Sequence, residues 1–301
     1  MKRTVLILAT LLLAASATAD DGCCGAGSDD KPPSTGLSVF ANASGYWAAK
    51  NAAEFYSGRD ENSNTINRII HSDQYGSVIW TRLVNAGLIS PSAIGNYRQF
   101  KVVEFPPEMY YRTSYQIGLG IRYDYNSGFG WLLRFDMAKL QALGAFNLSS
   151  DNGTGILGSN QYITCGIMGS EHRYNIDLAL TKTVPLGDAL DIEMDLGASL
   201  INTKVEDNII EVGGSTYSIL DRTNGQSPDY GVAEYEYQNQ GRIGYGVFVS
   251  ALVGYRVGGI GAIKLGYTCS QACIAFQGSK TWGWQHSVGI RFELNNFSFF
   301  N

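Results

Sequence analysis

The sequence has little charge and little proline, and beyond its first residues it has no long hydrophobic run. Charged residues make up 16% of the 301 residues, and there are 7 prolines, 3 histidines and 5 cysteines. Because an average soluble chain carries about 25% charged residues, neither a disordered tail nor an ordinary surface-charged enzyme is indicated. The formal net charge of -5 leaves no basic surplus to neutralise phosphates, which argues against a nucleic-acid partner.

The N-terminus has the pattern of a secretory signal. Lys2 and Arg3 precede a largely apolar run over residues 5–13, and the small residues Ala17 and Ala19 follow with one residue between them. This pattern predicts a signal peptide over residues 1–19, and we expect residues 20–36 to be a flexible N-terminal segment. After the signal, no run of about 18 apolar residues predicts a transmembrane helix. A β-barrel can still cross a membrane, because only every second side chain of its strands faces lipid.

Alternation with a period of two dominates the rest of the chain. Over residues 110–125, Ile117, Leu119 and Ile121 alternate with Gly118 and Gly120, and tyrosines flank them in phase. A period of two sustained this long predicts a strand and not a helix. The same period recurs over residues 131–138, 173–180, 191–200, 242–256, 263–268 and 282–293, and more weakly over 37–46, which predicts about eight strands.

Each predicted strand has one apolar face and one face of glycine, small polar and charged residues. The polar faces carry glycines and charges of both signs, which could pair within a confined lumen. We therefore expect the polar faces to line the interior and the apolar faces to contact lipid. The predicted connections on one side are tight, at 126–128, 185–188 and 258–259. Those on the other side are long or medium, at 47–107, 149–159 and 213–240, except for a short last one at 278–280. We therefore predict an all-β fold, an antiparallel up-and-down transmembrane β-barrel over residues 37–295. The alternative is a soluble β-sandwich or lipocalin-like barrel with the apolar faces inside.

The pattern resembles the small eight-stranded outer-membrane barrels of the OmpA and OmpX type. The resemblance extends from about residue 37 to 294 and includes an aromatic-rich C-terminal tail over residues 296–301 with Phe297, Phe299 and Phe300. These families often end on an aromatic residue, whereas this chain ends at Asn301. The resemblance implies the outer membrane of a Gram-negative cell as location and outer-membrane lipid as a partner. It implies no single activity, because such barrels include anchors, adhesins, narrow pores and lipid-modifying enzymes.

A helical insertion is predicted over residues 47–100, within the first outer connection. The isoleucines Ile66, Ile69 and Ile70 form one stripe behind a possible cap at Ser63. A second stripe, a stop and a further helix start are predicted at Tyr75, Ile79, Leu83, Gly87 and Ser90-Pro91. The insertion is expected to be a lid on the barrel mouth, with an exposed recognition surface or a periplasmic subdomain as the alternatives.

Charged residues on the polar faces predict a lumen filled by ion pairs and hydrogen bonds. An eight-stranded barrel is just wide enough for side chains to fill it. A narrow passive channel for small hydrophilic solutes is the alternative. The predicted network comprises Arg112, Arg122, Arg134, Asp136, Asp177, Glu193, Asp195, Arg242, Arg256, Lys264, Arg291 and Glu293.

Aromatic residues near the ends of the predicted strands are expected to sit at the two membrane interfaces, where amphipathic rings are favoured. This set comprises Tyr111, Tyr123, Tyr125, Trp131, Tyr245, Tyr255, Trp282, Trp284 and Phe292.

Chemistry-bearing residues are sparse. Ser170, Glu171 and His172 are adjacent, but neighbours in a strand point to opposite faces, so a catalytic trio is not predicted. Cys269 and Cys273 would lie roughly 13 Å apart in a regular strand, beyond disulfide reach. No metal-ligand spacing or phosphate loop is present, so no cofactor is expected. The predicted function is a structural or surface-interaction role, with an envelope or surface protein as a possible partner, and no enzymatic activity; a membrane-embedded lipid-modifying enzyme is the third hypothesis.

Overall fold

The computed structural model describes residues 36–59, 65–89, 100–103, 107–125, 127–150, 161–220, 240–257 and 261–295. The predicted signal peptide, all but the last residue of the predicted N-terminal segment, and the tail 296–301 lie outside these ranges.

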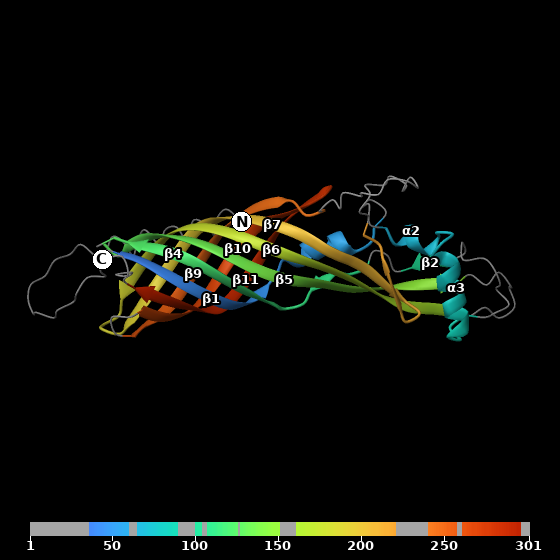
Figure 1. Cartoon of the computed structure of the whole chain (residues 1–301), viewed down its shortest axis with the longest axis horizontal. Helices are drawn as coiled ribbons and strands as arrows, with labels where there is room; N and C mark the ends of the chain where they lie inside the picture. The colour runs from blue at the N-terminus through green and yellow to red at the C-terminus, as the bar shows by residue number, and fades with distance from the viewer. Residues whose placement is uncertain are drawn as a thin grey trace, which may run out of the picture. The chain divides into compact units, whose positions relative to one another are not determined.

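Eight antiparallel strands close into a ring. Each strand pairs with the next along the chain, and the last pairs with the first, so the hydrogen-bonded sheet has no gap. The fold is an up-and-down β-barrel of eight strands, as the alternation predicts (Figure 1). The ring strands are β1 (Gly36–Trp47), β4 (Ser114–Asp124), β5 (Phe129–Ser150), β6 (Gln161–Pro185), β7 (Leu190–Val212), β9 (Ile243–Val257), β10 (Gly261–Phe276) and β11 (Ser279–Asn295).

Tight connections gather at one end of the ring, which we call the turn end. One joins β4 to β5 through Gly128, which adopts a φ of 71°. A Cβ there would also lie 2.8 Å from the Thr183 carbonyl oxygen, so the turn requires glycine. The other end, which we call the loop end, receives the long connections and also one tight turn, between β10 and β11 at residues 277–278. In outer-membrane barrels short turns face the periplasm and long loops face outward.

Three strands run well beyond the others toward the loop end. β5, β6 and β7 have 22, 25 and 23 residues, and their loop-end parts, residues 139–150, 161–172 and 202–212, form what we call the extension (Figure 1). Short strands border it: β2 (Phe100–Val103) and β3 (Tyr110–Tyr111) pair with β5, and β8 (Ser215–Ser218) pairs with β7. At about 3.3 Å per residue, β5 continues for roughly 40 Å past Met137.

The predicted helical insertion contains a 3-10 helix, η1 (Lys50–Tyr56), and two α-helices, α2 (Ile66–Ile70) and α3 (Gly76–Asn85). α3 ends before Gly87, as predicted, because a φ of 70° there stops the helix. The predicted cap at Ser63 and the helix start at Ser90 lie outside the described residues. The first stripe and two members of the second, Ile79 and Leu83, are buried in one cluster with Ile210 and Val212 of β7. Tyr75, predicted in the second stripe, is exposed.

The distribution of apolar side chains reverses along the three long strands. In β5, Leu133 and Phe135 are exposed and Arg134 and Asp136 are buried near the turn end. Farther along the same strand, the buried residues are apolar, among them Ala142, Phe146 and Leu148. β6 and β7 reverse in the same way, with Cys165, Ile167, Ile210 and Val212 buried. The barrel is therefore apolar outside near the turn end and apolar inside in the extension.

The reversal occurs at one level, marked by Lys139, His172 and Lys204, which are neighbours in the β5–β6–β7 register. We call these three residues the boundary row. Two backbone irregularities lie beside it. The β6–β7 pairing shifts between Ser170 and Glu171, and the β3 and β4 registers against β5 differ by one residue. In β7 the shift exchanges the two faces, since the buried residues are odd-numbered up to Val205 and even-numbered from Asn208. β5 and β6 keep one phase throughout and reverse through the type of residue that faces inward.

No helix in the described ranges is both long and apolar enough to cross a bilayer.

Candidate functional site in the barrel interior

The outside of the barrel on the turn-end side of the boundary row is an apolar surface. It exposes large side chains from all eight strands, among them Leu119, Ile176, Leu178, Val247 and Leu265. So large a contiguous exposed apolar surface is unfavourable in water and favourable in lipid. A closed antiparallel barrel with this exterior is the architecture of outer-membrane proteins, and the chain is an outer-membrane β-barrel.

Most of the predicted interfacial aromatics lie on this surface. Tyr125, Tyr255 and Phe292 are exposed toward the turn end, and Tyr123 and Trp131 are half-buried beside them, their rings stacked with centroids 6.3 Å apart. On the loop-end side, the exposed residues of the set are Tyr245, Trp282 and Trp284.

Tyr111 is the exception, and its placement corrects the prediction. Its hydroxyl accepts a hydrogen bond from Arg173 Nη2 at 3.2 Å and donates one to Glu171 Oε2 at 3.2 Å, so the ring points into the barrel. Arg112, predicted in the lumen, is exposed instead. Both differences have one cause: the register offset between β3 and β4 falls at residues 112–113 and exchanges the faces.

A first ion-pair cluster lies nearest the turn end, around Glu193. This carboxylate is fully buried and contacts three cations, Arg122, Lys264 and Arg291. Lys264 also lies 2.6 Å from Glu293, and Arg291 lies 3.1 Å from Asp195. Strands β4, β7, β10 and β11 supply these side chains, so the cluster ties opposite walls of the barrel together.

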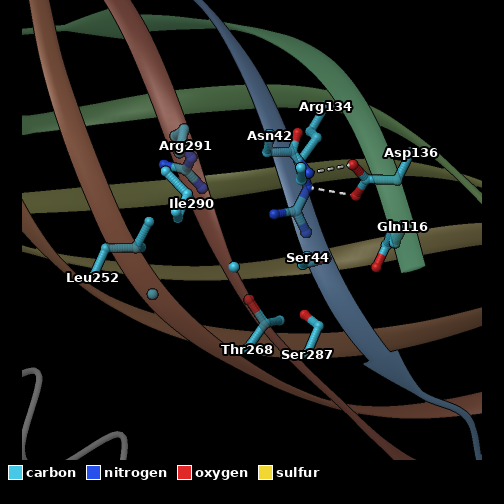
Figure 2. Close-up of a pocket in the computed structure, with 13 residues that line it drawn as sticks. Asn42, Ser44, Gln116, Arg134, Asp136, Leu252, Thr268, Ser287, Ile290 and Arg291 are labelled. Atoms are coloured by element: carbon cyan, nitrogen blue, oxygen red, sulfur yellow. Dashed lines mark hydrogen bonds and ion pairs between the residues drawn. The ribbon is translucent and has the colours of Figure 1, made fainter. Parts of the chain in front are cut away.

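A second cluster lies around Arg134 of β5. Its guanidinium lies 2.8 Å from Asp136, to which Asn42 donates a hydrogen bond of 2.9 Å (Figure 2). It also lies 2.5 Å from Asp177. Arg134 also stacks over the ring of Phe248, 5.3 Å from its centroid. The buried Arg134 cation is thus stabilised by two carboxylates and by a cation–π contact with Phe248.

A third cluster, closest to the loop end, was not in the predicted network. Arg173 and Glu171 are both fully buried and lie 2.6 Å apart. Arg173 also donates to the Tyr46 hydroxyl at 3.4 Å and to Gln285 at 3.3 Å. Glu171 and Arg173 occupy the same alternating positions of β6 as Asp177, the positions that face inward. This phase is the sequence signal that would have placed both residues in the predicted network.

Two predicted network residues lie at the margins. Arg256 is half-exposed near the turn end and lies 3.1 Å from Asp191. The predicted set omitted Asp191, and it also omitted Asp124, which pairs with Arg122. Arg242 is exposed and is not among the buried cations. The Gly241 bridge to Phe276 is offset by one residue from the β9–β10 register, which places Arg242 at an irregularity just before β9.

The space between the clusters is small. A cavity of about 40 Å³ lies beside Asn42, Gln116, Asp136 and Thr268 (Figure 2), and a second of about 30 Å³ lies near Tyr46 and Ser199. Such volumes hold a few water molecules at most. The interior beside these two cavities is therefore packed with side chains.

The η1 helix packs against the barrel wall on the loop-end side of the third cluster. Phe55 stacks on Phe276 of β10 with ring centroids 4.2 Å apart. The Tyr56 hydroxyl donates to Glu171 Oε2 at 2.5 Å. Burial raises the pKa of the Tyr56 hydroxyl well above its usual value, and the charge of Glu171 raises this pKa further, so the phenol stays protonated.

The other chemistry-bearing residues within the described ranges do not form a reactive set. His172 lies 3.4 Å from Glu206 on the outside, whereas Glu171 points inward. His286 accepts or donates a hydrogen bond with the Tyr267 hydroxyl at 2.7 Å. Cys165, Cys269 and Cys273 are free thiols. Among the described residues no group of three or more His, Cys, Asp or Glu side chains is arranged to hold a metal ion.

The outer face of the extension carries a groove of about 560 Å³. Its apolar wall includes Leu143, Met168 and Ile209, and the carboxylates of Glu108 and Glu211 lie at its border. The groove faces away from the interior clusters, since these positions alternate with the buried residues of the same strands.

No protein-family model and no curated protein matches the chain. Solved structures with some similarity include Neisserial surface protein A (NspA), at 10% identity and a TM-score of 0.39, covering 87% of this chain and 98% of that chain. They also include the outer membrane protein OprG from Pseudomonas aeruginosa, at 10% identity, 88% and 99% coverage, and a TM-score of 0.35. The attachment invasion locus protein Ail of Yersinia pestis, in complex with the heparin analogue sucrose octasulfate, has 11% identity, 86% and 100% coverage, and a TM-score of 0.32.

Proposed function

We propose that the chain is a non-conducting outer-membrane barrel whose extension acts as a surface-interaction platform. The observation that carries this proposal is the filled interior: three buried ion-pair clusters follow one another, and η1 packs beyond the last of them. The described cavities there, of about 40 and 30 Å³, leave no wide water path. This favours a structural role over the narrow channel, and it gives no support to an enzyme.

The extension supports the interaction role. A barrel that only anchors needs strands long enough to cross the membrane, whereas β5, β6 and β7 continue past the apolar surface and enclose a hydrophobic core of their own. The helices α2 and α3 bury their isoleucines and Leu83 in this core, which favours a lid for the extension over an exposed recognition surface.

The partner that fits the outer face is a polypeptide of an envelope or surface protein. The groove offers Met168 and Ile209 to an apolar side chain and the carboxylate of Glu211 to a neighbouring cation, whereas Glu108 is already paired with Lys50. Apolar contact with a charged border is typical of protein recognition surfaces.

Two measurements test the proposal. In planar bilayers, the purified full-length protein is expected to give no current steps above the detergent background, and reproducible steps would favour the channel. For the platform, cells producing the wild type should bind one another or immobilised envelope proteins, and cells producing Met168→Asp/Ile209→Asp should lose that binding.

The matched control for the groove variant is Thr164→Asp, an exposed position of β6 outside the groove lining. Equal binding by the groove variant and the control would contradict the platform role while leaving the non-conducting barrel in place.

A further inference from the structure

The boundary row places basic side chains in direct register on the outside of the barrel. Lys139 of β5 faces His172 of β6, and His172 faces Lys204 of β7. Neighbouring strands lie about 4.8 Å apart, so Lys139 and Lys204, two strands apart, lie roughly 10 Å from each other. Two exposed cations at this spacing favour an anion close by.

The chain itself supplies only part of that anion. Glu206 lies 3.1 Å from Lys139 and 3.4 Å from His172. Asp207 lies one pair farther toward the loop end, opposite Ser170. Within the described part of the chain, Lys204 forms no ion pair, although it is exposed.

A third exposed cation, Arg112, extends the row on its β5 side. Its backbone N–H donates to the Gln141 carbonyl at 3.0 Å, and Gln141 is two residues from Lys139 on the same face of β5. Its guanidinium donates to the Gln141 side chain at 3.4 Å, and no carboxylate of a described residue pairs with it. Arg112, Lys139 and Lys204 thus form a cationic strip across the outside of the barrel.

The level of this strip identifies the kind of anion. On β5 and β6 the next outward residues toward the turn end are Met137 and Tyr174, which belong to the apolar surface. The strip therefore lies where the hydrocarbon ends and lipid headgroups begin, on the loop-end side of the membrane. At the opposite rim, the outward cation Lys182 is occupied internally, because it donates to the Ser127 carbonyl at 3.0 Å and lies 3.9 Å from the centroid of the Phe129 ring.

We infer that Arg112, Lys139 and Lys204 bind the phosphate groups of an anionic lipid in the outer leaflet. The phosphate offsets the repulsion within the row, and the adjacent apolar side chains contact the lipid's acyl region. Binding of this lipid does not depend on whether the groove binds a protein, because the two surfaces use different residues.

The test compares full-length wild type with Arg112→Gln/Lys139→Gln/Lys204→Gln by native mass spectrometry in detergent. The probes are diphosphoryl lipid A, the same lipid without phosphates, and inorganic phosphate. Lys182→Gln is the matched control, and slower gel migration after boiling verifies that each variant is folded. At about 1 kcal/mol per surface cation, each substitution weakens binding about fivefold and the triple variant roughly a hundredfold.

The expected result is tight binding of diphosphoryl lipid A to the wild type and to Lys182→Gln, and weak binding to the triple variant. Equal binding of the dephosphorylated lipid, or a triple variant within twofold of wild type, would overturn the inference and leave an ordinary solvated surface. If inorganic phosphate binds as tightly as lipid A, the ligand is a free anion and the lipid assignment fails. Should the triple variant not fold, single Lys204→Gln and Arg112→Gln proteins must each show the fivefold loss.

Discussion

The hydroxyl of Tyr56 lies 2.5 Å from Oε2 of Glu171 and ties the η1 helix to the inner face of β6. The neighbouring Gly169 makes room for this contact, because a Cβ there would come within 2.1 Å of the Tyr56 ring. Glu171 is also held by Arg173 at 2.6 Å, so one buried carboxylate joins the insertion to the barrel wall. The position of η1 is therefore fixed by specific hydrogen bonds as well as by apolar packing.

Replacing Tyr56 with phenylalanine tests this link. The ring and its packing on Phe276 remain, but the hydrogen bond to a charged group is lost, so we expect the free energy of unfolding to fall by about 2 kcal/mol. Urea unfolding in lipid vesicles measures it, with Tyr75→Phe, at an exposed ring, as the control. Equal stability of the two variants would show that η1 is held by packing alone.

Glu193 is the residue whose loss should be most harmful to the interior. Glu193→Gln leaves Arg122, Lys264 and Arg291 around a neutral side chain in a buried site, and breaking such a cluster costs about 3–5 kcal/mol. Glu206→Gln, which removes a partly exposed pair, should cost less than about 1 kcal/mol.

A second substitution checks the electrostatic cause. Lys264 lies against both Glu193 and Glu293, so it keeps one carboxylate in Glu193→Gln. If charge balance couples Glu193 to Lys264, the loss of stability in Glu193→Gln/Lys264→Met should be smaller than the sum of the losses in the two single variants. If the two losses simply add, the clusters act by packing and not by charge balance.

The strands and the sidedness of the barrel could be predicted from the sequence because each depends on a local period. Leu119 and Gly120 alternate whatever the rest of the chain does, and the ring of eight strands confirms that pattern. The helices α2 and α3 follow for the same reason, since their stripes repeat within a few residues.

The placement of individual side chains near the boundary row could not be predicted. Tyr111 and Arg112 were assigned to the wrong faces because a single bulge reverses every position beyond it, and only the pairing with β5 reveals the bulge. In β7, Val205 and Asn208 are both buried across the shift beside Ser170, which simple alternation forbids. The contact of Tyr56 with Glu171 joins residues far apart in sequence, and no local pattern indicates it.

The thiol of Cys165 should be unreactive toward alkylating reagents in the folded protein. Cys165 is buried in the extension, and burial raises the pKa of its thiol to about 12, so at pH 8 only about one molecule in ten thousand carries the reactive thiolate. In a protein whose other four cysteines are serine, we expect no maleimide labelling of Cys165 until denaturant is added. The control moves the thiol by one residue, Thr164→Cys with Cys165→Ser, and this exposed position should label quickly. Rapid labelling of native Cys165 would mean that the extension does not enclose a core.

The outward orientation of the apolar surface makes Leu178 and Thr164 respond differently to the same substitution. Both side chains are exposed and both lie on β6, but Leu178 is within the apolar surface and Thr164 is in the extension. If lipid surrounds Leu178, an arginine there places a charge in hydrocarbon and should cost about 2–4 kcal/mol, whereas Thr164→Arg should change stability by less than about 0.5 kcal/mol. If water surrounds both side chains, Leu178→Arg only removes an exposed apolar side chain. It should then lower the free energy of unfolding by no more than Thr164→Arg does. Urea unfolding of both variants in lipid vesicles distinguishes the two cases, and equal free energies would place the barrel outside the membrane.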